Sequence, residues 1–198
     1  MKKLLLILLI FIMLTGCAAP AAEEVVLPEE ETVAETPEET AAQAEEEVIP
    51  LGTFTAQALT GGAYDERYFA DAELTVINVW ATYCGPCKQE MPVLGALDRE
   101  LEDVQFLGIV TDVLDQQGEP DPKQVEVALE LHKALGCDYP SLILNEDLAM
   151  LGFAGLTAVP ATLFVDKAGN LVGQGFYGAL DETQWRAVIA ERLEMTRS

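Results

Sequence analysis

The sequence of 198 residues is poor in basic residues, with 11 Lys and Arg against 34 Asp and Glu and a formal net charge of −23. No basic patch is present, and so acidic a surface repels nucleic acid and anionic lipid headgroups. There is one histidine, and the four cysteines include only one Cys-x-x-Cys pair, so the ligands of a zinc site are incomplete. No internal repeat is visible. We therefore expect no nucleic-acid partner, no metal and no cofactor.

The first 17 residues have a charged start, an apolar run and a small-residue end. Lys2 and Lys3 precede an apolar run at residues 4–14, which is short for a membrane span. The following Leu-Thr-Gly-Cys, ending at Cys17, resembles a bacterial lipobox. That resemblance implies cleavage before Cys17 and attachment of lipid to its thiol and new amino terminus. An ordinary signal peptide or a short uncleaved anchor is the alternative. In each case the rest of the chain is expected to leave the cytoplasm.

Residues 18–50 contain eleven Glu and four Pro but no Lys, Arg, His, Gly or aromatic residue. Such a segment buries too little apolar surface to offset chain entropy, and its like charges repel one another. We expect a disordered, extended tether, with metal capture by the Glu cluster as a weaker alternative. Residues 51–198 form the expected domain, with 23 acidic and 9 basic residues. Because this domain is acidic, membrane attachment must come from the lipid.

The domain alternates between strand and helix patterns, which predicts an α/β fold. The apolar, β-branched run at residues 74–80 is expected to be a central strand buried on both faces. A helix and a second strand follow it, which favours a parallel pair with a right-handed crossover. Pro92 is expected to kink the intervening helix. Asp181 caps the final helix, with Gln184 three residues on. Strands are predicted at residues 54–59, 74–80, 104–111, 141–144, 161–165 and 171–176, and helical segments at 88–101, 123–135 and 147–153.

Two thiols stand two residues apart where the central strand gives way to a helix. Cys84 is expected at the helix amino terminus, where free backbone N–H groups and the helix dipole favour a thiolate. Pro86 suits the first turn because it lacks an N–H and has a preset φ. Cys87 then lies about one turn inside, close enough to form a disulfide with Cys84. The pattern predicts a redox site, and a permanent disulfide or half of a zinc site is the alternative.

Residues 80–88, Trp-Ala-Thr-Tyr-Cys-Gly-Pro-Cys-Lys, resemble the active site of the thioredoxin superfamily. Glu-Met-Pro at residues 90–92 is similar to the TlpA/ResA-type branch, the membrane-tethered extracytoplasmic thiol–disulfide oxidoreductases. Ala-Val-Pro-Ala-Thr at residues 158–162 resembles the cis-proline loop of that fold. The resemblance covers residue 51 to the carboxyl terminus. It implies a thioredoxin-like fold, a central mixed β-sheet flanked by helices, with an extra helix and strand inserted at residues 112–144.

The resemblance also implies a division of roles. Cys84 is the nucleophile, which attacks a disulfide as a thiolate, and Cys87 is the resolving thiol. Pro160 is expected in a cis bond, packed against the disulfide and pairing with substrate backbone. Glu90 shares a helix face with Cys87 and would accept the proton of that buried thiol; a solvated helix glutamate is the alternative. Asn78 stands where thioredoxins have a buried Asp, and Asn cannot accept a proton, which leaves Glu90 as the candidate.

Other residues near the cysteines have less specific expectations. Trp80 is expected in the core and His132 on a solvated helix surface. Cys137 is expected to be a buried free thiol, with a regulatory disulfide as the alternative. Four residues beside the cysteines are expected to contact substrate: Tyr83, Gly85, Pro86 and Val159.

Together these features predict a monomeric, lipid-anchored thiol–disulfide oxidoreductase on the extracytoplasmic face of the bacterial cell envelope. Gly-Pro between the cysteines resembles reducing thioredoxins, which favours a disulfide reductase. The resemblance implies protein disulfide substrates: apocytochrome c thiols (in cytochrome c maturation), envelope proteins or oxidised methionine sulfoxide reductases. Reduction requires electrons from a transmembrane partner of the CcdA/DsbD kind. A peroxiredoxin-like thiol peroxidase is an alternative, although its Pro-x-x-x-Thr-x-x-Cys pattern is absent before Cys84. A non-enzymatic binding lipoprotein is another.

Overall fold

A five-stranded mixed sheet forms the centre of the computed structural model, which describes residues 48–197. Its strand order is β5-β4-β3-β6-β7. The pairs β3–β4 and β4–β5 are parallel, whereas β6 runs antiparallel to both β3 and β7. The predicted mixed α/β sheet is therefore confirmed. The strands are β3 (Leu74–Trp80), β4 (Val104–Val110), β5 (Ser141–Ile143), β6 (Ala161–Asp166) and β7 (Phe176–Tyr177).

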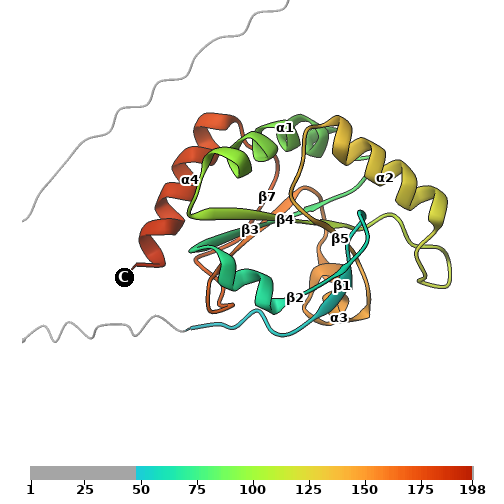
Figure 1. The fold of residues 1–198 in the computed structure, drawn as a ribbon, viewed down its shortest axis with the longest axis horizontal. Coiled ribbons are helices and arrows are strands. Elements are labelled where there is room, and N and C mark those ends of the chain that lie inside the picture. The colour runs from blue at the N-terminus through green and yellow to red at the C-terminus, as the bar shows by residue number, and fades with distance from the viewer. Residues whose placement is uncertain (1–47, 198) are drawn as a thin grey trace, which may run out of the picture. The chain divides into compact units, whose positions relative to one another are not determined.

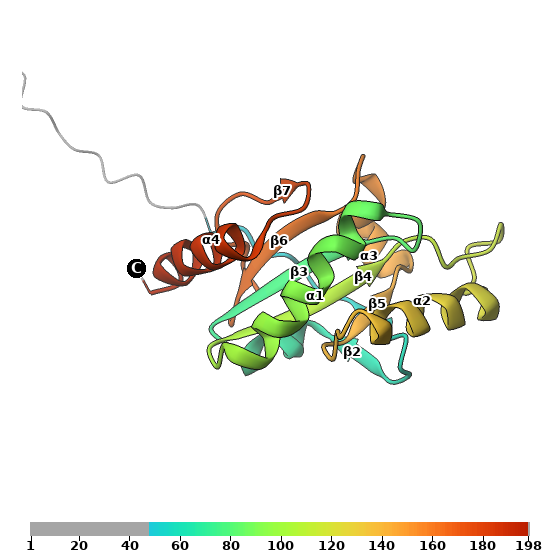
Figure 2. The ribbon, with the colours of Figure 1, turned by 90° about the horizontal axis from the view of Figure 1, so that it is seen from above.

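Helices cover both faces of this sheet, as Figure 1 shows. One face carries α1 (Gly85–Glu100), α2 (Pro122–Ala134) and α4 (Glu182–Met195). The view from above in Figure 2 shows the same three helices lying over the strands. The other face carries the antiparallel hairpin of β1 (Thr55–Gln57) and β2 (Ala63–Asp65), with η1 (Glu66–Asp71), α3 (Glu146–Met150) and η2 (Phe153–Gly155).

All seven residues of β3 are buried, as its apolar sequence predicted. Successive side chains of a strand point to opposite faces, so β3 contributes to two separate cores. Val76 and Trp80 belong to the core beneath α1, α2 and α4. Ile77 and Val79 belong to the core shared with β1, η1 and α3. Because it is buried on both sides, β3 firmly supports the segment that follows it, residues 81–84, which we call the cysteine loop.

Helix α1 begins at Gly85 rather than at residue 88 and continues past Pro92 to Glu100. It starts early because the Cys84 side chain caps it and Pro86 fits the first turn. The predicted strand at residues 171–176 is wrong except at its last residue, because the strand here is β7, Phe176–Tyr177. Leu171 makes only an isolated bridge to Val165, and Gly173 then turns the chain with φ of 61°.

The predicted amino-terminal cap of the last helix is confirmed. The Gln184 N–H donates to Oδ1 of Asp181 at 2.9 Å, and the Asp181 N–H donates to Oε1 of Gln184 at 3.0 Å. This reciprocal capping box fixes the start of α4. It also fixes the preceding Leu180, which lies close to α1, the cysteine helix.

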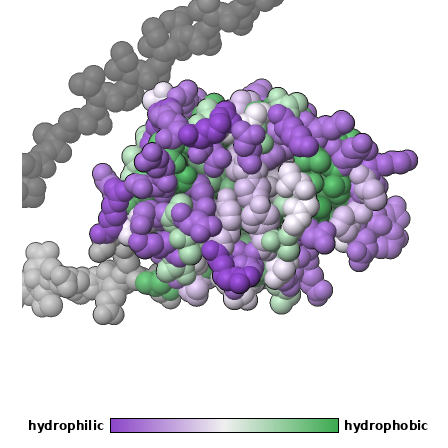
Figure 3. Space-filling view, viewed as in Figure 1, coloured by the Kyte–Doolittle hydropathy of each residue, from purple (hydrophilic) through white to green (hydrophobic). Residues whose placement is uncertain are grey.

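The face of the molecule in Figure 3 is largely hydrophilic, consistent with the acidic composition. None of the helices between residues 48 and 197 has the length and apolar character needed to cross a bilayer. The expected signal sequence, Cys17 and nearly all of the Glu-rich tether lie outside the described residues, and those expectations stay predictions.

Candidate active site

The two cysteines lie in the loop and first helical turn that follow β3. The Cys84 N–H donates to the Ala81 carbonyl at 3.1 Å, which closes a tight turn after the strand. Cys84 is the N-cap of α1, and its Sγ accepts the Cys87 N–H at 3.1 Å. The two sulfurs are joined as a disulfide. Both are buried, but Cys84 is 5% exposed and Cys87 is 0% exposed, so Cys84 is the more accessible of the two. This asymmetry fits the predicted roles of nucleophile and resolving thiol, and those roles remain predictions.

Pro160 lies far along the chain from the cysteines but at the same end of the central strands. Because β6 is antiparallel to β3, Val79 near the end of β3 pairs with Ala161 at the start of β6. The Val159–Pro160 bond is cis, as predicted. Pro160 is buried, and its carbonyl accepts the Gly178 N–H at 2.9 Å. The register therefore brings the proline loop to the strand end from which the cysteine loop leaves.

The surface around Cys84 is open on one side. Tyr83 is 74% exposed, and Gly85 and Pro86 are also exposed, whereas Val159 is half-buried. Tyr83 and Val159 line one pocket of about 210 Å³. The four predicted substrate-contact residues are thus available to a ligand, and contact itself stays a prediction.

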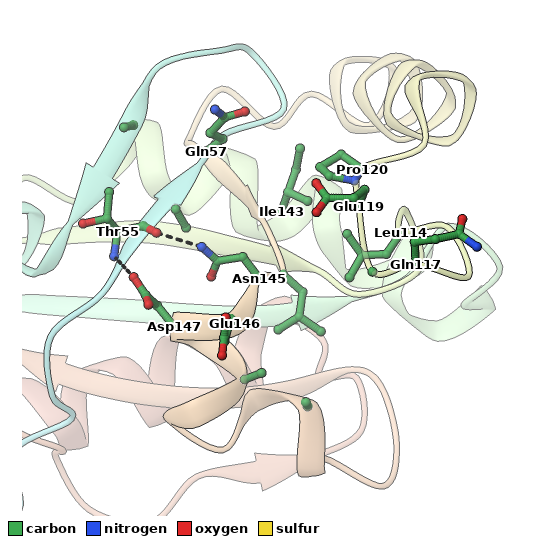
Figure 4. Close-up of a pocket in the computed structure, with 16 residues that line it drawn as sticks. Thr55, Gln57, Leu114, Gln117, Glu119, Pro120, Ile143, Asn145, Glu146 and Asp147 are labelled. Carbon is green, nitrogen blue, oxygen red and sulfur yellow. Dashed lines mark hydrogen bonds between the residues drawn. The ribbon is translucent and has the colours of Figure 1, made fainter.

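A larger pocket of about 930 Å³ adjoins this one, because the two share Leu144 and Ala154 in their walls. Figure 4 shows it between the β1 strand, the end of β5 and the loop that carries Gln117 and Glu119. Two hydrogen bonds join residues that line it (Figure 4). The Thr55 N–H donates to Asp147, and Asn145 Nδ2 donates to the Thr55 carbonyl. The two pockets therefore lie next to each other, and the smaller one begins at Tyr83, the residue before Cys84.

Glu90 is buried on the inner face of α1, which contradicts the alternative of a solvated glutamate. It is 1% exposed and lies three residues after Cys87 on α1. Its Oε1 accepts Nδ2 of Asn78 at 3.0 Å, and its Oε2 accepts the Leu180 N–H at 3.2 Å. Burial raises the pKa of Glu90 to about 7, although these two hydrogen bonds oppose the shift. The carboxyl can therefore exchange a proton near neutral pH.

His132 is buried, and the expectation that it would be solvated is wrong. It is 3% exposed, stacks on Trp80 with ring centroids 5.9 Å apart, and meets Tyr139 edge-on at 5.1 Å. Burial lowers the pKa of His132 to about 4, so its ring is neutral at physiological pH. The α2 periodicity left the position ambiguous, because an imidazole has both an apolar face and polar nitrogens. Trp80 is buried as predicted, and its Nε1 donates to Oγ of Ser141 at 2.8 Å.

Cys137 is a buried free thiol, as predicted. Its Sγ donates to the Met91 carbonyl at 3.4 Å, and burial raises its pKa to about 11. A thiol with so high a pKa is almost entirely protonated near neutral pH and reacts slowly. These features disfavour the alternative of a regulatory disulfide.

No sequence pattern identified the group that holds the loop before Cys84. The Asp112 carboxylate lies just beyond the end of β4 and accepts three hydrogen bonds from Thr82. An Asp in a polar loop has many ordinary explanations, and only the parallel pairing of β3 with β4 brings it to Thr82.

A disulfide at a helix amino terminus, beside a cis-proline loop on a five-stranded mixed sheet, defines a thioredoxin-like protein. A solved thiol:disulfide interchange protein of the thioredoxin family from Chlorobium tepidum has the same fold. It is 19% identical, with a TM-score of 0.62 over 76% of this chain and 99% of that one. The pneumococcal exposed lipoprotein thioredoxin of Streptococcus pneumoniae is also similar. It is 21% identical, with a TM-score of 0.53 over 71% of this chain and 99% of that one.

The family model described as the AhpC/TSA family matches residues 49–174, and the chain belongs to that family. A curated relative, the thiol:disulfide interchange protein DsbE of Pseudomonas fluorescens biotype C, is 27% identical over 119 residues. The match spans 60% of the length of each of the two chains.

Proposed function

We propose that this protein is a thiol–disulfide oxidoreductase that uses Cys84 and Cys87 to reduce disulfides of other proteins. The observation that carries the proposal is the Cys84–Cys87 disulfide at the helix amino terminus, in which Cys84 keeps 5% of its surface exposed and Cys87 none. A pair that only stabilised the fold would not need to lie beside the exposed Tyr83, Gly85 and Pro86. The relative named DsbE and the solved thioredoxin-family protein are both named thiol:disulfide interchange proteins, which supports the same reaction.

In the reaction we propose, the reduced protein presents the Cys84 thiolate to a substrate disulfide. The thiolate attacks one sulfur, a mixed disulfide forms, and the first substrate sulfur leaves as a thiolate. Cys87 then gives its proton to Glu90 and attacks Cys84. The intermolecular bond breaks, the second substrate sulfur leaves, and the Cys84–Cys87 disulfide of the structure is formed. Two electrons pass from the protein to the substrate.

Glu90 fits the proton step for two reasons. Its buried position raises its pKa to about 7, which suits a base that works near neutral pH. Asn78, which is fully buried and donates to Glu90, carries an amide and cannot accept the proton. Tyr83, Gly85, Pro86 and Val159 would contact the substrate, and the Pro160 loop would pair with its backbone.

The cellular setting is part of the proposal. The lipobox-like Cys17 and the Glu-rich tether support attachment by lipid to the extracytoplasmic face of a bacterial membrane. The similarity to an exposed lipoprotein thioredoxin is consistent with this location. Each turnover leaves the protein oxidised, so a membrane dithiol donor of the CcdA/DsbD kind would have to reduce it again. The protein would act as a monomer.

Catalysed reduction of insulin disulfides by the full chain tests the proposal, with Cys84→Ser as the inactive control. We expect turnover by the wild type and a reduction potential of the Cys84–Cys87 couple near about −270 mV. A potential near about −120 mV would identify an oxidant instead. Turnover of peroxide by the purified protein would point to a peroxidase, and no turnover in either redox direction to a binding lipoprotein.

A further inference from the structure

The loop between β3 and the cysteine helix is held by two side chains, Asp112 from the segment after β4 and Lys88 from the cysteine helix itself. Thr82 lies two residues before Cys84, and each of its polar groups has a partner. Its N–H lies 3.0 Å from Oδ1 and 2.9 Å from Oδ2 of Asp112, and its hydroxyl donates to Oδ2 at 2.5 Å. Its carbonyl accepts Nζ of Lys88 at 3.3 Å. One carboxylate thus fixes both the backbone and the side chain of Thr82.

The position of Asp112 explains how it reaches this loop. Strands β3 and β4 are parallel and in register from Leu74 and Val104 to Trp80 and Val110, so their carboxyl ends lie side by side. The Thr111 N–H extends this pairing by donating to the Trp80 carbonyl at 3.1 Å. Asp112 is the next residue, and its half-buried carboxylate faces the loop that leaves β3. Charge-assisted hydrogen bonds in a half-buried setting are stronger than neutral ones.

We infer that Asp112 is a positioning residue for Cys84. By fixing Thr82, it holds the turn in which the Cys84 N–H meets the Ala81 carbonyl, and it thereby keeps Sγ of Cys84 at the helix amino terminus. There Sγ accepts the Cys87 N–H, a contact that favours the thiolate. The inference rests on the proposed function, because it concerns the reactivity of the proposed nucleophile.

Two effects of Asp112 on Cys84 have opposite signs and can be separated by substitution. Its negative charge opposes a nearby thiolate, whereas its hydrogen bonds to Thr82 favour the thiolate by placing Sγ correctly. Asp112→Asn removes the charge but keeps an oxygen that can accept the Thr82 N–H. Asp112→Ala removes both. If positioning dominates, the Ala variant is less reactive than wild type and the Asn variant is not.

The experiment is alkylation of the reduced full chain by iodoacetamide, followed by mass spectrometry of the peptide that contains Cys84. We expect Asp112→Ala to slow alkylation at pH 7 by about tenfold, the effect of losing one charge-assisted hydrogen bond. The pH of half-maximal alkylation should move upward. Thr82→Val, which keeps the Asp112 charge but loses the hydroxyl, should slow alkylation less, and Thr82→Ser should restore it.

Asp115→Ala is the matched control, since it removes an equal charge three residues away. Asp115 accepts the N–H groups of Gln117 and Glu119 within its own loop and makes none of the Thr82 contacts. Circular dichroism and thermal melts check that every variant folds. If Asp112→Ala does not fold, the comparison of Thr82→Val with Thr82→Ser tests the inference instead.

Alkylation of Asp112→Ala at the wild-type rate overturns the inference. Equal acceleration in the Ala and Asn variants overturns it too, because Asp112 would then act through its charge alone. Alkylation does not require disulfide exchange. The expected pattern in a protein that cannot reduce insulin would therefore reject the proposed function and leave the positioning role standing.

Discussion

Asn78 and Glu90 join the central strand to the cysteine helix through one buried hydrogen bond, 3.0 Å between Nδ2 and Oε1. The Leu180 N–H, just before α4, holds the other oxygen of Glu90 at 3.2 Å. The carboxyl group is thus fixed between three elements, one of which carries Cys87. Because burial raises its pKa to about 7, small changes of pH near neutrality change its charge.

The first prediction concerns Glu90 in turnover. Glu90→Gln is nearly isosteric but cannot accept a proton, so it should slow the reduction of insulin by about 10- to 1000-fold. The pH–rate profile should also lose a limb near pH 7. The control is Glu126→Gln, which makes the same change at an exposed position of α2. A full rate with an unchanged profile would mean that water accepts the proton.

The second prediction concerns the same residue in stability. Its folded-state pKa of about 7 lies above its ordinary value of 4.5, so the unfolded chain loses this proton first. The resulting penalty is absent below about pH 4.5, grows as the pH rises to about 7, and is constant above. Denaturant unfolding of the oxidised proteins measures this effect. The free energy of unfolding of Glu90→Gln, relative to that of wild type, should increase by about 2–3 kcal/mol between pH 5 and pH 8. A difference that does not change with pH contradicts the buried, titrating carboxyl.

The third prediction concerns His132, whose shift has the opposite consequence. Its folded-state pKa of about 4 lies below the ordinary 6.5, so the unfolded chain takes up the proton first as the pH falls. The folded protein should lose up to about 3 kcal/mol between pH 6.5 and pH 4. His132→Phe keeps an aromatic ring against Trp80 and should lack this loss. Since Glu90 titrates in an overlapping range, the comparison is made in the Glu90→Gln background, and equal acid sensitivity would show that His132 is accessible.

The fourth prediction concerns the division of roles between the thiols. Cys87→Ser should accumulate a mixed disulfide with substrate through Cys84, because attack occurs and resolution does not. Cys84→Ser should trap nothing, since Cys87 is fully buried. Non-reducing electrophoresis followed by mass spectrometry of the linked peptides measures both. Trapping by the Cys84→Ser variant instead would reverse the assignment.

The fifth prediction concerns attachment to the membrane. Cys17→Ser should release the protein from membranes in cell fractionation, because the thiol that would carry the lipid is gone. Insulin reduction by the released protein should match that of the wild type. Persistent membrane association would indicate an uncleaved anchor in place of a lipid.

The parts of the fold that depend on local chemistry could be predicted from the sequence. The β3 strand was recognisable from its nearly continuous apolar, β-branched run, and the start of α4 from the Asp181 and Gln184 cap. The cis bond at Pro160 was predictable only because the surrounding residues resemble a known loop. Periodicity alone does not distinguish a cis from a trans proline.

The features that sequence could not supply depend on contacts between distant elements. The burial of His132 is set by Trp80 and Tyr139, which come from β3 and from the segment before β5. The Asp112 contact with Thr82 requires the parallel register of β3 and β4. Glu90 could be placed on the face of Cys87, whereas its burial also depends on the chain at Leu180, 90 residues further on.

The pairing of Val79 with Ala161 has a consequence for how such a protein can diverge. It is the last of six antiparallel pairs between β3 and β6, and this ladder holds the strand end before the cysteine loop beside the proline loop, although about 80 residues of chain separate them. Residues 114–156 provide none of the hydrogen bonds described at Cys84, Glu90 or Thr82. That stretch includes the loop at Gln117 and α3, which line part of the larger pocket in Figure 4. Sequence changes confined to the exposed loop at Gln117 can reshape this pocket while those hydrogen bonds stay in place, whereas Ser141 and His132 of the same stretch contact Trp80.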